Sequence, residues 1–329
     1  MVGYVVRRTI SGFLTLIAIS FMTFALFTYG PSDPAEAMCT SAQCTPAKLE
    51  LIRENLGLNE PFMTQYTTYM KGIVQDREIS SGELSVTCYA PCLGISFKLG
   101  EPVRPYLMER LPATISVAVG AAMIFLPLGV LIGVIAARYR GTSTDKLVVT
   151  SSLIISAIPY YLVALLAYLF LVSKWGIFGE TGYYPITENP FKWFSGLLLP
   201  WIVIGITSSV TYARFSRGSM VESLGEDYVR SARAKGVGQK SVIVRHALRS
   251  ALVPVITIFG LEFATLLSGT VFTEKIFAID GVGKAAIDAI SASDLPLIEA
   301  TVLLAAFLIV AGNIVVDMMY SWLDPRVRL

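Results

Sequence analysis

The stretch Leu111–Ala137 has the sequence LPATISVAVGAAMIFLPLGVLIGVIAA and contains no Asp, Glu, Lys or Arg. A helix needs roughly 20 apolar residues to cross a hydrocarbon core of ~30 Å, so this stretch is long enough. Lipid offers the backbone no hydrogen-bond partners, whereas a helix pairs its backbone groups within the segment itself. The stretch therefore predicts a transmembrane helix.

Further apolar runs that are long enough to cross a membrane lie on both sides of this stretch. Three have no charged residue, and the last two contain only Glu262 and only Asp317, respectively. The runs are Thr9–Ser32, Leu147–Ser173, Trp193–Ala213, Ser250–Thr273 and Ala300–Tyr320. Charged residues make up 15% of the 329-residue chain, against about 25% in soluble proteins. The sequence thus predicts an all-α membrane protein with six transmembrane helices.

The distribution of Lys and Arg predicts the orientation, because cytoplasmic loops carry an excess of these residues. Basic residues precede the first run, follow the second run and the last run, and cluster between Arg214 and Arg249. The loops 174–195 and 273–299 hold few of them. Both termini are therefore expected in the cytosol, with the chain in the cytoplasmic membrane. The first run is longer than a signal-peptide core and no A-x-A-like site follows it, which favours a retained anchor.

We expect three zones: an anchor helix at 1–32, an extracytoplasmic segment at 33–110 and a core of five helices at 111–329. The cysteines lie in the extracytoplasmic segment, and they are Cys39, Cys44, Cys88 and Cys92. Their even number, close spacing and location favour disulfides over a metal site. The local pairing Cys39–Cys44 and Cys88–Cys92 competes with two cross-linked pairings, and free thiols are a further alternative.

The cytoplasmic loop 214–249 has an order of charges that suits a helix. Acidic residues come first, basic residues follow, and Gly236 and Gly238 end the run before a second basic helix at Gln239–Arg249. Two short helices bent at a glycine are able to fit a groove on a partner protein. An ordinary basic loop is the alternative. The candidate contact residues are Glu226, Asp227, Tyr228, Arg230, Ala232, Arg233, Ala234, Lys235 and Gly236.

The stretch EDYVRSARAKG at 226–236, followed by RHALR at 245–249 and LVP at 252–254, closely resembles the coupling loop of ABC-importer permeases. The resemblance is to the B-type subunit of the dipeptide/oligopeptide permease family. Other stretches resemble the same family in the same order: DPA at 33–35, LGL at 56–58, ERLPAT at 109–114 and LDPR at 323–326. The cysteine-bearing stretch Val86–Leu93 departs from the family pattern.

This resemblance implies the type I ABC-importer permease fold and a role in moving di- or oligopeptides, or similar small solutes, across the membrane. It implies three kinds of partner besides lipid: a homologous second permease, two cytosolic ATPases and an extracytoplasmic solute-binding protein. No nucleic-acid partner is expected. The ATPases would bind ATP and Mg, so no cofactor is expected in this chain. An importer for nickel complexes or other small solutes is an alternative, and a membrane assembly or receptor protein is another from a different class.

The sequence gives no sign of an enzyme. It has no G-x-x-x-x-G-K-[ST] loop for hydrolysing ATP, and its single His246 leaves no histidine cluster for a metal. The stretch GVGKAA at 281–286 formally fits a nucleotide-binding pattern, but it follows a membrane span rather than a strand.

Glu262 and Asp317 are acids within apolar runs, where charges are costly and commonly face a cavity or a partner. Glu262 is expected either on the solute pathway or as a hydrogen-bonded acid between helices. For Asp317 a structural role is expected.

Overall fold

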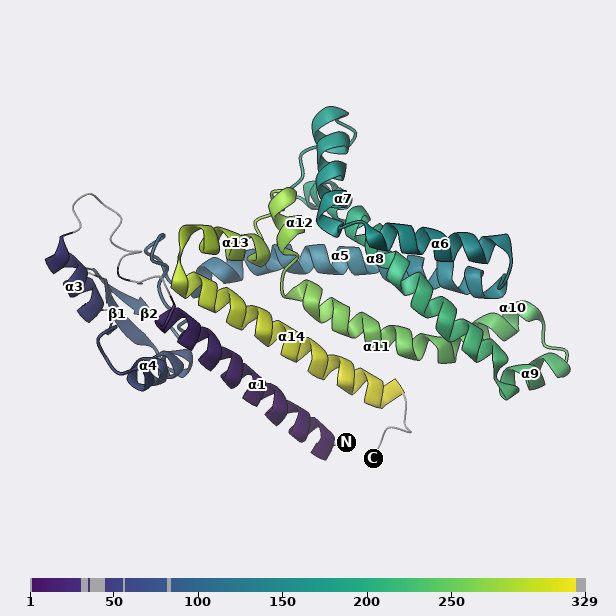
Figure 1. Ribbon diagram of the computed structural model, residues 1–329, viewed down its shortest axis with the longest axis horizontal. Helices are drawn as coiled ribbons and strands as arrows, with labels where there is room; N and C mark the ends of the chain where they lie inside the picture. Colours follow the sequence, from purple (N-terminus) through teal and green to yellow (C-terminus); the bar gives the residue numbers. More distant parts are fainter. Residues whose placement is uncertain (1, 31–34, 36–44, 56, 82–83, 324–329) are drawn as a thin grey trace.

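The computed structural model describes residues 2–30, 35, 45–55, 57–81 and 84–323. Long helices run side by side along the length of the molecule (Figure 1). They are α1 (Val2–Thr28), α5 (Val103–Arg138), α8 (Pro190–Gly225), α11 (Leu248–Leu267) and α14 (Leu295–Leu323). Within the described residues, five helices are long and apolar enough to cross a membrane, and a bent helix pair brings the number to six.

Several helices extend beyond the apolar runs that predict them. Both α5 and α8 contain 36 residues, or about 54 Å of helix, which exceeds the ~30 Å of hydrocarbon. Helix α5 begins at Val103 rather than Leu111, because a helix that leaves the lipid continues wherever its polar side chains are solvated. The expected boundary between the extracytoplasmic segment and the core therefore falls inside this helix.

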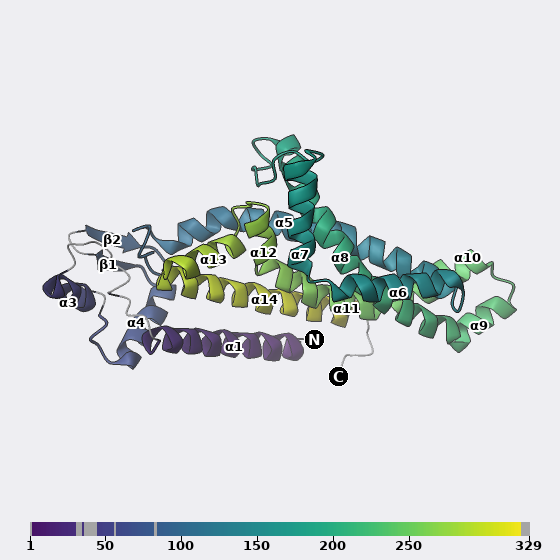
Figure 2. The ribbon, with the colours of Figure 1, turned by 45° about the horizontal axis from the view of Figure 1, so that its top comes forward.

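The third apolar run forms two helices instead of one straight helix. Helix α6 (Ser143–Ala157) is followed by α7 (Tyr160–Ala167), which continues as a π-helix, η1 (Tyr168–Lys174), and the two parts are bent by 86°. Pro159 explains the break, because it disfavours the helical conformation at the preceding residue, and Ile158 is extended (φ −84°, ψ 126°). Helix α7 consequently leaves the bundle at a steep angle (Figures 1 and 2).

Helix α7 is held at its base by contacts with α12 (Val271–Ile276). The hydroxyls of Tyr160 and Thr273 contact each other, and the ring of Tyr168 lies edge-on to Phe277 with 6.0 Å between centroids. These contacts fix the direction of the bend.

The centre of the bundle is the pair α5 and α8, whose backbones approach closely at glycines. A Cβ at Gly133 would lie 2.6 Å from the carbonyl oxygen of Ala213, so no larger residue fits there without displacement. Next to this approach, the buried ring of Phe125 stacks on Tyr212 with 4.9 Å between centroids. Phe259 of α11 adds a third ring at 6.0 Å from Phe125.

A small lobe from the predicted extracytoplasmic segment lies at one end of the bundle (Figure 1). It contains α3 (Pro46–Asn55), α4 (Phe62–Val74) and an antiparallel hairpin of β1 (Arg77–Ser81) and β2 (Leu84–Cys88), in which Arg77 lies opposite Cys88. Helix α4 packs on α1 through aromatic rings, including Phe21 with Tyr66 at 5.2 Å. The hairpin was not predicted from the sequence.

The predicted coupling loop lies at the opposite end of the bundle. Its first residues, 214–225, continue α8, and the rest forms α9 (Asp227–Ala234), α10 (Gln239–Ser241) and a π-helix, η2 (Val242–Ala247), which leads directly into α11. The second helix expected at Gln239–Arg249 is thus divided among α10, η2 and the start of α11. Helix α1 starts and α14 ends on the side that faces α9 (Figures 1 and 2). An ion pair between Arg8 and Asp317 joins α1 to α14, in agreement with a structural role for Asp317.

Candidate functional site

Helix α9 has one apolar face, which holds it against the bundle. Val229 and Ala232, one turn apart, are buried with exposures of 0% and 8%. Val229 packs with Met220 of α8 and Val242 of η2, in a cluster that continues into α11. Ala232 is buried beside it and does not lie on the outer surface of the helix. Val229 was absent from the predicted site, although its i, i+3 spacing from Ala232 was the available signal.

The opposite face of α9 is charged and open to solvent. Asp227 and Arg230 have side chains that are 97% and 71% exposed, and they lie 3.5 Å apart. The other predicted contact residues on this surface are also exposed, namely Glu226, Arg233, Ala234 and Lys235. Tyr228 is exposed as well, but its hydroxyl is directed toward α11. Helix α9 therefore packs against the bundle through its apolar face and exposes a face of mixed charge to solvent.

Gly236 ends this helix in a conformation that only glycine adopts readily. Its φ is +79°, and the Gly236 N–H donates to the carbonyl oxygen of Arg233 at 3.0 Å. The chain turns there and enters α10, as the glycine break in the sequence predicts.

A group of hydroxyls lies behind α9, where it meets the membrane helices. The Ser250 hydroxyl of α11 lies 2.7 Å from the Tyr228 hydroxyl of α9 and 3.0 Å from the Ser223 hydroxyl of α8. Ser223 and Ser250 were not predicted, because a serine in a helical pattern gives no signal of its own.

Glu262 lies on α11, on the side that faces α8. Its side chain is partly exposed, and it faces the fully buried Tyr212 of α8. The two residues come from different apolar runs, so nothing in the sequence indicates that they face each other.

The glycine pattern at 281–286 surrounds a carboxylate of the chain itself. Glu274 is fully buried, and it accepts hydrogen bonds from the Thr114 hydroxyl at 3.0 Å and the Lys284 N–H at 3.0 Å. Burial raises the pKa of this carboxyl group, while the hydrogen bonds act in the opposite direction. A Cβ at Gly281 would collide with the carboxylate. The N-terminus of α13 (Val282–Ala292) thus holds Glu274 where a nucleotide-binding loop would hold a phosphate.

Family comparison covers almost the entire chain. Residues 129–329 match the model of the binding-protein-dependent transport system inner membrane component, and residues 1–118 match the N-terminal model of the same kind of membrane component. The chain belongs to this family. It therefore has the type I ABC permease fold, with the small lobe inserted after the first helix.

Individual relatives of this transport component are similar over their full length. The chain is 35% identical to a putative peptide transport system permease protein of Brucella abortus (strain 2308), over 100% of this chain and 99% of that protein. It is also 35% identical to a di/tripeptide transport system permease protein of Pseudomonas aeruginosa (strain UCBPP-PA14), with the same coverage. A dipeptide transport system permease protein of Escherichia coli (strain K12) is 32% identical, again over 100% and 99%.

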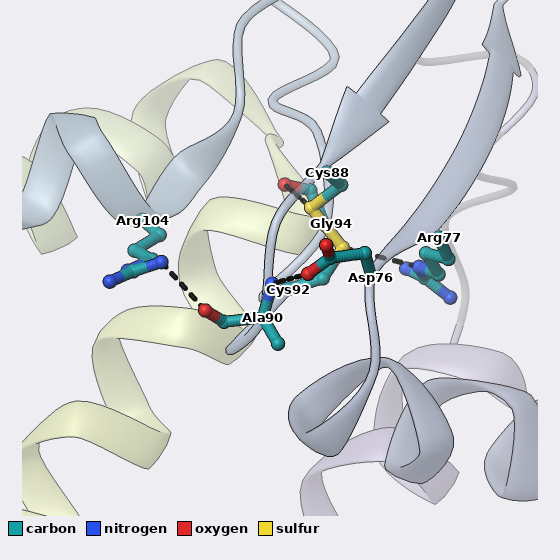
Figure 3. The surroundings of a disulfide bond; sticks show 7 residues. All are labelled: Asp76, Arg77, Cys88, Ala90, Cys92, Gly94 and Arg104. Atoms are coloured by element: carbon teal, nitrogen blue, oxygen red, sulfur yellow. Dashed lines mark hydrogen bonds between the residues drawn. A yellow bond between two sulfur atoms is a disulfide. The ribbon is translucent and has the colours of Figure 1, made fainter.

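The lobe of this transport component contains a disulfide between Cys88 and Cys92, whose sequence separation is 4 (Figure 3). The turn that it closes is bound on both sides: the Ala90 N–H donates to Asp76 at 2.7 Å, and Arg104 donates to the Ala90 carbonyl at 2.7 Å. Cys39 and Cys44 lie outside the described residues, so the pairing expected for them is untested. Among the described residues, no three His, Cys, Asp or Glu side chains are grouped as metal ligands.

The lobe is also tied to the bundle through a buried acid. Asp294, which is 1% exposed, accepts hydrogen bonds from the Ser96 hydroxyl and from the Phe97 N–H at 3.1 Å. It stands at the start of α14, where the carbonyl oxygen of Asp294 also accepts from the Ile298 N–H at 2.9 Å. The position of the lobe is thereby fixed relative to the helices that follow it in the chain by almost 200 residues.

Proposed function

We propose that this chain is the transmembrane permease subunit of an ATP-driven importer that moves di- or oligopeptides across the cytoplasmic membrane. One observation carries the proposal: the full-length similarity to permeases of peptide transport systems from several bacteria. The names of these relatives favour peptides over nickel complexes as the solute.

The arrangement of the two ends supports a set of partners. The exposed charged face of α9 suits the groove of a cytosolic ABC ATPase, and two such subunits would bind ATP and Mg. The lobe at the opposite end suits an extracytoplasmic solute-binding protein (Figure 1). A homologous second permease subunit would complete the pathway. In this orientation both termini are cytosolic, and the chain needs no cofactor of its own.

The contact with the ATPase is tested by changing the outer face of α9. Arg233→Glu reverses an exposed charge, and Gly236→Pro removes the residue whose φ of +79° forms the turn. Both variants are expected to insert normally and to lose at least about tenfold in uptake. Arg233→Glu would leave a charge unpaired across the interface, which costs about 2–5 kcal/mol. Gly236→Pro would remove the turn that ends α9. Uptake and ATP hydrolysis are measured together in sealed vesicles that contain the complete complex.

A control charge reversal separates this effect from a general one. Lys146→Glu alters an exposed residue of α6 outside α9, and normal uptake is expected. Full uptake by both Arg233→Glu and Gly236→Pro would refute the proposed ATPase contact.

The solute is tested by binding and uptake with the solute-binding protein present. We expect saturable, ATP-dependent accumulation of labelled di- or oligopeptides by vesicles that contain the complex. Accumulation of a nickel complex in place of every peptide would instead show the alternative solute. If the affinity-purified chain does not co-purify with any ATPase subunit, the proposed function as an importer subunit is wrong.

A further inference from the structure

The hydroxyl of Ser250 lies where three helices meet. Ser250 is in the first turn of α11, and its Oγ is 3.0 Å from Ser223 Oγ in the last turn of α8. The same oxygen is 2.7 Å from Tyr228 Oη on α9. The side chain of Ser250, on α11, therefore contacts both α8 and the short helix α9.

The same two long helices meet again farther from α9. Tyr212 of α8 faces Glu262 of α11, about 17 Å along α8 from Ser223 and about 18 Å along α11 from Ser250, at ~1.5 Å per residue. The hydroxyl contact at Ser250 and the facing pair of Tyr212 and Glu262 thus lie at matching heights on antiparallel helices. A displacement of α11 against α8 at Ser250 would also change how Tyr212 and Glu262 face each other, because both pairs lie between the same two helices.

The backbone around Ser250 is less regular than the rest of α11. The π-helical segment Val242–Ala247 comes just before it, and Pro254 lies one turn after it. A proline lacks the N–H of a regular helical hydrogen bond, and π-helical turns are common at functional sites. The start of α11 is therefore able to change its angle at a lower cost than a regular helix.

We propose that Ser250 is a positioning residue that transmits displacement of α9 to α8 and α11. The inference rests on the proposed function, in which an ATPase moves α9. The apolar contact of Val229 holds α9 in place but is not directional. Hydrogen bonds are directional, and those between the Ser250 hydroxyl and the hydroxyls of Tyr228 and Ser223 fix α9 relative to both long helices.

The test measures peptide transported per ATP hydrolysed, in sealed vesicles that contain the complete complex. Ser250→Ala is expected to lower this ratio ~2- to 10-fold, the equivalent of one net hydrogen bond. ATP hydrolysis should continue. Ser250→Thr keeps the hydroxyl and should restore the ratio. Tyr228→Phe should lower the ratio as Ser250→Ala does, and the double variant should be no worse than the worse single variant, because both changes remove the same contact.

A matched control uses the other end of α11. The Ser268 hydroxyl donates to the carbonyl oxygen of Thr265 in its own helix at 2.7 Å, so Ser268→Ala should leave the ratio unchanged. A normal ratio in Ser250→Ala would overturn the inference. So would a lowered ratio that Ser250→Thr fails to restore, or effects of Ser250→Ala and Tyr228→Phe that simply add.

The outcomes also separate this inference from the proposed function. If Arg233→Glu uncouples transport and Ser250→Ala does not, the ATPase contact stands and the role of Ser250 is wrong. If neither variant changes the ratio, the proposed docking of α9 is wrong as well.

Discussion

Single acidic residues decide much about this permease, and Glu274 is the clearest example. Its carboxylate accepts hydrogen bonds from α5 and from the N-terminus of α13, so it fastens three elements at one point. Helix N-termini attract anions, and here the anion is supplied by the chain itself. The glycines at 281 and 283 leave the space that the carboxylate occupies.

Glu274→Gln is expected to destabilise the permease by about 1–3 kcal/mol, because the amide nitrogen cannot accept the hydrogen bonds that the carboxylate oxygen accepts. Thermal unfolding of the purified protein in detergent measures the effect. Asp288→Asn is the control: the Asp288 side chain is 42% exposed on α13, so its ion pair with Lys275 contributes little. Equal unfolding temperatures for the two variants would refute this role for Glu274.

Glu262 combines a buried neighbour with an open side. Tyr212 provides a polar neighbour, and the partial exposure of Glu262 leaves its carboxylate able to meet a solute. We predict that Glu262→Gln lowers uptake of cationic peptides more than uptake of neutral peptides, because the change keeps the size and removes the charge. Competition uptake with peptides of matched length checks this. Equal uptake of both classes by Glu262→Gln would favour a purely structural acid.

Glu262→Leu provides the companion experiment. It removes the polar group that faces Tyr212, so a structural acid would make this variant less stable than Glu262→Gln by about 1–3 kcal/mol. A loss of folded protein in both variants would count against the pathway role.

At the scale of the element, the hairpin of the lobe depends on a short covalent link. Cys88 and Cys92 close a turn whose Ala90 is hydrogen-bonded to Asp76 on one side and to Arg104 of α5 on the other (Figure 3). Burial lowers the pKa of Arg77, which donates to Cys92 Sγ at 3.3 Å. The turn that the disulfide closes therefore connects the lobe to the start of α5 through the hydrogen bond from Arg104.

We predict that Cys88 and Cys92 are protected from maleimide in the denatured, unreduced protein and become labelled after reduction. A Cys39→Ser/Cys44→Ser background restricts the readout to this pair. Removing the link with Cys88→Ser/Cys92→Ser should cost about 2 kcal/mol, given the short loop that it closes. Limited proteolysis should then cleave the lobe faster than the helical core. Labelling of both thiols without reduction would contradict the disulfide in the native protein.

The broken third span shows how an element depends on its surroundings. Pro159 explains the break, which was not predicted from the sequence, and the contacts of Tyr160 and Tyr168 with α12 and Phe277 decide that α7 leaves at 86° to α6. The apolar composition of the run was a correct guide to a membrane segment, and it could not reveal the direction of the chain after the proline.

At the scale of the whole molecule, the lobe and α9 lie at opposite ends of the bundle (Figures 1 and 2). Because the bundle spans the membrane, we expect these ends on opposite sides of it. We predict that a cysteine introduced at Met63, which is 60% exposed on α4, reacts with a membrane-impermeant maleimide in intact cells. A cysteine at Asp227 should react only after permeabilisation.

The background for these variants again lacks Cys39 and Cys44, and the native Cys88–Cys92 disulfide does not react. Reaction of Asp227→Cys in intact cells, with no reaction of Met63→Cys, would invert the orientation that the Lys and Arg distribution predicts.

The sequence by itself determined the features that rest on local composition. Long uncharged runs are costly in water and stable in lipid, so they specify the membrane spans. The order of charges with Gly236 specifies the helix and turn of the predicted coupling loop. Residues such as Val229 were within reach of the same reasoning, because an apolar face repeats at helical spacing.

Only the tertiary structure decided which polar groups meet. Ser223 and Ser250 are 27 positions apart, Thr114 and Glu274 are 160 apart, and Ser96 and Asp294 are 198 apart. A hydroxyl or carboxylate gives no sign of a distant partner, because its hydrogen bond depends on a separation near 3 Å and on direction, both of which arise when the helices pack. The spans were therefore readable from the chain, while the contacts that join them were set by the fold.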